Sequence, residues 1–215
     1  MNRATRTIVS TIGVILGIAG LDHGIFEILQ GNTPTSGLII QAIGPDLKLW
    51  GTEEALTIIP NFLLTGIAAV IVSLATIAWS VRFVHTQHGA RVFGLLFILL
   101  FLVGGGIAAQ IMFAPVTWAA ATRINKPLDW WRKILPETAR RVLAKIWPVT
   151  LALGSLSLLI GLFIAITGFV PGESDSERIL GICWAFVFGG GLGMYLLTFV
   201  AGFAYDIQKQ GGKAE

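Results

Sequence analysis

The sequence predicts an all-α integral membrane protein, with about five transmembrane helices packed in one bundle. Of its 215 residues, 54% are hydrophobic and only 13% are charged, about half the charged fraction of a soluble domain. The mean hydropathy is correspondingly high, at +0.78. Five apolar segments are each long enough to cross a hydrocarbon core of roughly 30 Å as a helix. They lie at about 7–30, 55–80, 92–122, 148–170 and 179–205.

These segments are expected to be helical because a backbone amide in lipid must find its hydrogen-bond partner within the segment. The whole chain, 1–215, then forms a single polytopic domain in the cell membrane. The first segment follows the basic stretch MNRATR and so imitates a signal peptide. Its apolar run continues past Asp22 to about Gly31, however, and we therefore expect a first spanning helix with no cleavage.

The polar insert at 123–147, between the third and fourth segments, predicts an amphipathic helix that lies at the membrane interface. Pro136 can start this helix, and Val142, Leu143, Ile146 and Trp147 then share one face. Basic residues of the insert are expected to bind anionic lipid headgroups, which makes the bilayer the first predicted partner. This lipid-binding set is Arg132, Lys133, Arg140, Arg141 and Lys145.

The composition excludes disorder, a DNA-binding domain and a disulfide-stapled module, so no nucleic-acid partner is expected. Cys183 is the only cysteine, and it cannot form an internal disulfide. A haem with two histidine ligands does not fit, because His23 lies at the opposite side of the membrane from His85 and His88. Zinc and phosphate-loop motifs are also missing from the sequence. We therefore predict no metal and no cofactor.

The orientation of the helices depends on whether segment 92–122 crosses the membrane once or turns back. With five full spans, 5 Lys and Arg residues lie on the side of the N-terminus and 10 on the other side. If 92–122 turned back at Gly104–Gly106, the count would become 13 against 2, which is a cleaner division under the positive-inside rule. Two full crossings do not fit into 31 residues, however, so five spans with the insert beside 31–54 remain the expectation.

The first segment contains the only acidic residues of the five, Asp22 and Glu27, which flank His23. A charge at bilayer depth costs at least about 2.5–3.5 kcal/mol on insertion scales, so it usually marks a function. His23 and Glu27 are four residues apart and share a helical face. The alternative is a structural polar clasp between helices.

Glycine spacing in the first segment predicts close approach of another helix to the same region. The residues concerned form two GxxxG pairs and are Gly13, Gly17, Gly20 and Gly24. Glycine clusters also occur at 104–106 and 189–193, and such faces could support a homo-oligomer. Counting depth along five spans places Asn61, Gln110 and Tyr195 in the same half of the membrane as His23 and Glu27.

Polar groups that converge from several helices predict a cavity open to one side of the membrane. The favoured function is binding or transport of a small solute, a cation or a proton at Asp22, His23, Glu27, Asn61, Gln110 and Tyr195. One alternative is a membrane-embedded enzyme that acts on a lipid-like substrate, with His23 and Glu27 as general acid and base. The other is a non-catalytic subunit or scaffold of a membrane complex.

Overall fold

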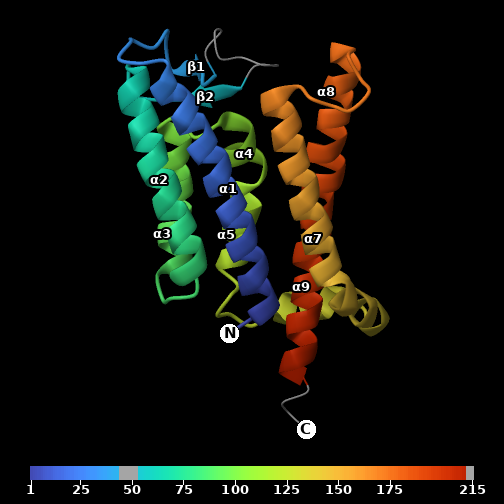
Figure 1. Cartoon of the computed structure of the whole chain (residues 1–215). Coiled ribbons are helices and arrows are strands. Elements are labelled where there is room, and N and C mark those ends of the chain that lie inside the picture. The colour runs from blue at the N-terminus through green and yellow to red at the C-terminus, as the bar shows by residue number, and fades with distance from the viewer. Residues whose placement is uncertain (44–52, 212–215) are drawn as a thin grey trace.

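Four helical stretches in the computed structural model, which describes residues 1–43 and 53–211, are long and apolar enough to cross a membrane (Figure 1). Apolar side chains such as Ile71 (61% exposed) and Phe163 (51%) cover their outer faces, as expected of a surface in contact with lipid. The four stretches are α1 (Arg3–Leu29), α2 (Phe62–Arg82), α7 (Glu137–Thr167), and a continuous run of α8 (Ser176–Trp184), the π-helix η1 (Ala185–Gly193) and α9 (Met194–Gly211).

A short hairpin joins α1 to α2. Its strands, β1 (Ile39–Gln41) and β2 (Glu54–Leu56), pair antiparallel with Ile40 opposite Ala55. The Gln30 side chain at the end of α1 donates hydrogen bonds to the carbonyls of Gln41 and Ala42 and so attaches the hairpin to the helix. This hairpin forms a cover over one end of the bundle, opposite the end that holds both termini (Figure 1).

The glycine face predicted in the first helix is confirmed as a close-packing surface, and it packs against α2. A Cβ atom at Gly20 would lie 2.7 Å from Ser73 Oγ, and one at Gly24 would lie 2.9 Å from the Gly66 carbonyl oxygen. Only glycine therefore allows this approach of the two helices. This face is already covered within the chain, and the homo-oligomer stays a prediction.

The single helix expected over 92–122 is wrong. The structure has α3 (Gly89–Leu102), which rises to the hairpin end, and then α4 (Ile107–Met112) and α5 (Ala114–Ala121), which run back. Residues 103–106 make the turn, with φ of +95° at Gly104 and +88° at Gly106, a region that favours glycine. The backbone of the turn is satisfied by protein, because Gly104 N donates to Leu56 O and Thr65 Oγ1 donates to Val103 O.

This turn reverses the predicted sidedness of the basic insert, which lies beside the N-terminus and not beside 31–43. Asn2 N donates to Ile124 O, and Asn125 Nδ2 donates to His85 O. The 14 residues of α3 rise only about 21 Å, too little to cross the hydrocarbon alone. Two full crossings within 31 residues are not needed, because α3 and α4–α5 need not span the hydrocarbon alone. The β1–β2 hairpin and α2 cover the turn between them.

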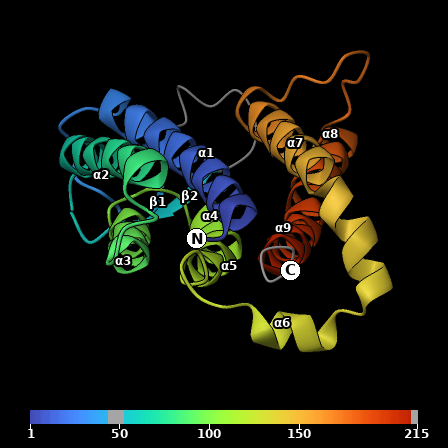
Figure 2. The same ribbon diagram turned by 90° about the horizontal axis from the view of Figure 1, so that it is seen from below.

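The expected interfacial helix is correct only in part. A short separate helix, α6 (Asp129–Ile134), lies across the end of the bundle (Figure 2). Its Trp131 packs on Phe203 with ring centroids 4.9 Å apart. Residues 137–147 do not form a helix of their own, because they are the first turns of the 31-residue α7. Pro148 inside α7 removes one backbone hydrogen bond, and α7 changes direction in this region.

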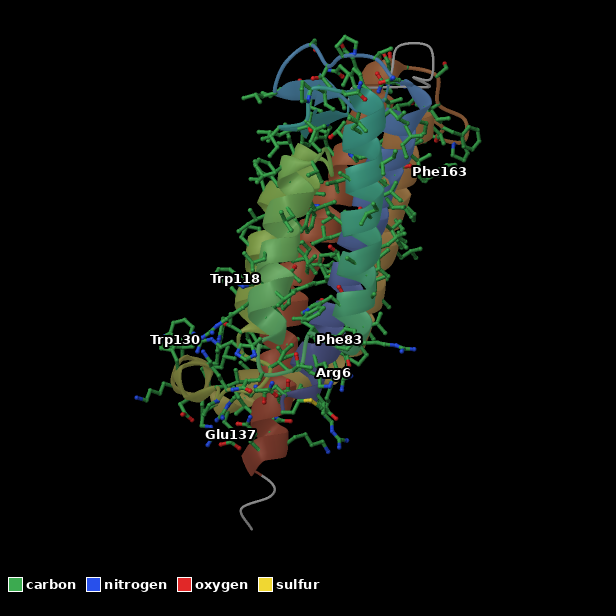
Figure 3. The ribbon with its side chains drawn as sticks, turned by 90° about the vertical axis from the view of Figure 1, so that its left-hand side faces the viewer. Arg6, Phe83, Trp118, Trp130, Glu137 and Phe163 are labelled. Atoms are coloured by element: carbon green, nitrogen blue, oxygen red, sulfur yellow. The ribbon has the colours of Figure 1, made fainter. Side chains whose placement is uncertain are left out.

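Basic residues gather at the end of the bundle that holds the termini. Lys48 and Lys213 lie outside the described residues, and 12 of the other 13 Lys and Arg residues are at this end, with Arg178 alone at the hairpin end. Figure 3 shows Arg6, Trp130 and Glu137 together at the basic end, with Phe163 toward the other end. The two ends of the bundle therefore differ strongly in charge.

An acidic residue of α9 caps the N-terminus of α1. Asp206 is 3% exposed and accepts hydrogen bonds from Ala4 N (3.1 Å), Thr5 N (2.9 Å) and Thr5 Oγ1 (2.7 Å). The first turn of a helix has no backbone partners for its amides, and a carboxylate also suits the positive end of the helix dipole. Asp206 therefore joins the last helix of the chain to the first.

Candidate functional site

The candidate site lies in the last turns of α1, beneath the hairpin. His23 is 7% exposed and Glu27 is fully buried. Among the described residues, His23 Nδ1 and both carboxylate oxygens of Glu27 have no hydrogen-bond partner. Buried polar atoms are normally paired, so three atoms on one helical face without a partner among the described residues make this region the candidate site.

The glycine turn between α3 and α4 packs directly on these two side chains. A Cβ atom at Gly104 would overlap both carboxylate oxygens of Glu27, and a Cβ atom at Gly106 would lie 2.8 Å from His23 Nε2. The turn therefore brings its backbone to the carboxylate and the imidazole with no side chain in between.

Two further acidic residues, Glu53 and Asp22, lie near His23. Glu53 Oε2 is 3.6 Å from His23 Nε2, which is longer than a hydrogen bond. Burial, with a smaller contribution from the negative charge of Asp22, raises the pKa of Glu53 to about 7. The exposed fraction of the side chain falls from 28% at Glu53 to 8% at His23, and Glu27 is fully buried. Exposure to solvent therefore decreases from Glu53 to His23 and from His23 to Glu27.

Gln110 joins the same site through the glycine turn. It is 5% exposed on α4, and its Nε2 donates to Gly105 O at 3.4 Å, while Oε1 has no partner among the described residues. The structure therefore brings together four of the six predicted site residues, namely Asp22, His23, Glu27 and Gln110.

The other two predicted site residues, Asn61 and Tyr195, have different contacts. Asn61 is the N-cap of α2: its side chain accepts from Leu64 N and donates to Asn32 Oδ1 at the hairpin end. Tyr195 is buried between α5, α7 and α9, where its hydroxyl donates to Ser155 Oγ and its ring meets Phe113 edge-on. The height assigned to Tyr195 assumed five full spans, and the turn at 103–106 reverses the direction of the helix on which it lies. Asn61 is at the hairpin end, where its side chain caps α2.

Sequence reasoning missed Glu53 and the role of the turn. Glu53 directly precedes β2, and the pairing of this strand with β1 holds it beside His23, a long-range contact that the sequence pattern does not predict. The sequence allows a reversal at Gly104–Gly106 as the alternative to five spans, but it does not indicate that this turn packs on His23 and Glu27.

The predicted headgroup residues lie at the opposite, basic end. Arg132, Arg140 and Arg141 line a small pocket of about 250 Å³ with Glu137. Arg141 donates a hydrogen bond to Glu137, so one of the three charges is partly neutralised. Binding of anionic headgroups by this set stays a prediction.

No group of three or more His, Cys, Asp or Glu side chains that could hold a metal ion was found among residues 1–43 and 53–211. A scan against protein-family models and searches of curated proteins and of solved structures found no match to the chain. The function must therefore be argued from the site itself.

Proposed function

We propose that this chain is a multi-pass protein of the cell membrane that binds a proton or a small cation at Glu27 and transfers it through His23. The observation that carries the proposal is the complete burial of a carboxylate whose two oxygens have no partner among the described residues. An unpaired charge inside a protein is very costly, so such a group is stable only when it holds a proton or a cation.

The order of the three groups supports transfer to and from the hairpin end. Glu53 is the most exposed, His23 lies next to it, and Glu27 is innermost. An imidazole between two carboxylates can accept a proton on one nitrogen and release one from the other. The pKa of Glu53 near 7 suits a group that exchanges protons with water at neutral pH.

Tight packing favours a proton or small ion over the broader class of solutes. The grooves found on the described residues are lined by neither His23 nor Glu27, and the glycine turn fills the space beside them. The positive-inside rule assigns the basic end to the cytoplasm, so the site opens toward the outside.

Infrared difference spectroscopy in lipid nanodiscs tests the proposal, because protonated carboxyl groups have a separate C=O band. We expect a band from a buried protonated carboxyl in the wild type and in the exposed-site control Glu54→Gln, and its loss in Glu27→Gln. Addition of Na⁺ at fixed pH distinguishes binding of a cation from binding of a proton alone. A cation that binds at Glu27 would displace the proton and so remove the band in the wild type. In proteoliposomes with an internal pH dye, Glu27→Gln should abolish gradient-driven proton entry.

A structural clasp gives a different pattern. In that case Glu27→Gln would leave proton entry unchanged, and Glu27→Leu alone would lower the free energy of unfolding. An unchanged carboxyl band in Glu27→Gln would likewise contradict the proposal, because it would assign the buried proton to another residue.

A second candidate, an enzyme that acts on a lipid-like substrate, is favoured by one observation. An apolar groove of about 660 Å³ between α3 and α4–α5 ends at Gln110, the residue that binds the glycine turn. A lipid chain in this groove would bring its head toward His23 and Glu27. Mass spectrometry of co-purified lipids checks this candidate, which requires an altered lipid with the wild type and not with His23→Gln.

A further inference from the structure

A second groove, of about 900 Å³, lies between α1 and α7, away from the site described above. The two helices run side by side in both Figure 1 and Figure 2. On α1 the lining residues recur every three or four positions and so occupy one helical face. Val81 of α2 and Ser155 and Leu159 of α7 complete the lining.

The polarity of this lining changes in one direction along α1. The groove begins at the basic end with Arg3 and Arg6, continues with the hydroxyl-bearing Thr7, Ser10 and Thr11, and ends with apolar side chains. These last residues of α1 are Val14, Ile15 and Ile18. The lining, taken over the described residues, includes no acidic side chain.

The length of the groove agrees with one leaflet of a bilayer. From Arg6 to Ile18 the helix rises about 18 Å, and half of a typical bilayer measures about 15 Å of hydrocarbon plus several ångströms of headgroup. The polar part of the groove is therefore at headgroup depth, and the apolar part is at acyl-chain depth. Its volume is also within the usual range for small-molecule sites, about 300–1,000 Å³.

We propose that this groove is a binding site for one anionic phospholipid, with the phosphate between Arg3 and Arg6 and an acyl chain along Val14 and Ile18. Arginine is suited to phosphate because its planar guanidinium can donate two parallel hydrogen bonds. The hydroxyls of Thr7 and Thr11 can donate to the glycerol ester region. Because the basic end faces the cytoplasm under the positive-inside rule, the groove opens to the leaflet that carries anionic lipid.

Native mass spectrometry of the full chain, titrated with phosphatidylglycerol or phosphatidylcholine in detergent, measures this binding. We expect one phosphatidylglycerol to be retained in preference to phosphatidylcholine. The double variant Arg3→Gln/Arg6→Gln should bind phosphatidylglycerol about 30-fold more weakly, since each basic group near an anionic headgroup contributes a factor of about five. The control Arg123→Gln/Lys126→Gln removes the same charge at exposed sites outside the groove and should change the affinity less than about threefold.

The apolar half of the groove is tested separately. Val14→Trp should fill the groove and remove the retained lipid, while Ile71→Trp, on a lipid-facing surface of α2, should leave it bound. Equal retention of the two lipids, or equal weakening by the two charge variants, would overturn the proposal in favour of general electrostatic attraction. If Val14→Trp does not fold, the arginine pair still decides the question, because both arginines are at the surface end of α1.

Discussion

Replacing Gly104 by alanine should destabilise the protein through its contact with Glu27. Gly104 has φ of +95°, and an L-residue in the left-handed region costs roughly 1–2 kcal/mol. The new Cβ atom would also lie within 3.0 Å of both carboxylate oxygens of Glu27, and one added methyl in a filled core typically costs 1–3 kcal/mol. We therefore expect Gly104→Ala to lower the free energy of unfolding by about 2–5 kcal/mol.

Gly172→Ala is the matched control for this substitution. Gly172 also has a positive φ, of +77°, but a Cβ atom there would meet nothing within 4 Å. Its replacement should cost only the backbone term, roughly 1–2 kcal/mol. Equilibrium unfolding in mixed micelles with increasing SDS, followed by circular dichroism, measures the difference between the two variants.

A double-mutant cycle assigns the remaining cost to the carboxylate. With Glu27→Ala in the background, Gly104→Ala should lose its steric term, and the coupling energy should be at least about 1 kcal/mol. If Gly104→Ala and Gly172→Ala cost the same, or if the cycle shows no coupling, the turn does not pack on Glu27 and the description of the site is wrong.

Three further predictions follow from the structure. Asp206→Ala should lower the free energy of unfolding by about 2–4 kcal/mol in the same SDS titration, because it leaves the buried amides of Ala4 and Thr5 unpaired. The fold raises the pKa of Glu53 from 4.5 to about 7, so the protonated carboxyl stabilises the protein below pH 4.5, and this contribution is lost as the pH rises through 7. The free energy of unfolding should therefore fall by up to about 3 kcal/mol across this range, and Glu53→Gln should remove the fall. Single cysteines in a Cys183→Ser background should react with an impermeant thiol reagent from opposite sides of the membrane. The two on one side are Ser36→Cys and Ser174→Cys, and the two on the other are Gln87→Cys and Lys126→Cys.

Hydropathy alone predicted the helical class and the approximate extent of α1, α2 and the last two long helices. It could not predict the reversal at 103–106, because α3 and α4–α5 are as apolar as one continuous span. The distribution of Lys and Arg was the better signal, because the 13-against-2 division holds only if segment 92–122 turns back at Gly104–Gly106. The requirement that both arms of this segment cross the membrane fully was too strict. Short apolar helices are stable when a turn between them is hydrogen-bonded to neighbouring protein, as it is to Leu56 and Thr65.

The sequence predicted the site residues that are identified by the free-energy cost of burying a charge, but not those that depend on which neighbour a side chain faces. His23 and Glu27 were identified because charge at bilayer depth is expensive, an argument that needs no knowledge of neighbours. Gln110 was grouped with them by height and is joined to them by the turn. Asn61 and Tyr195 were grouped by the same height argument and have other partners. Asp206 was missed because it follows the last apolar segment, and its partners are about 200 residues away in sequence.

The turn at 103–106 also explains why the basic insert supplies no partner for Glu27 among the described residues. By bringing α5 back, it places the insert 123–147 at the basic end, more than 20 residues along α1 from Glu27. From Glu27 to Arg6 the helix rises about 32 Å, which is several Debye lengths at physiological ionic strength. With five full spans the same insert would lie on the side of Glu27, where an arginine could neutralise it. In this fold the described basic residues of that end are far from Glu27, which supports a proton or an external cation as the partner of the carboxylate.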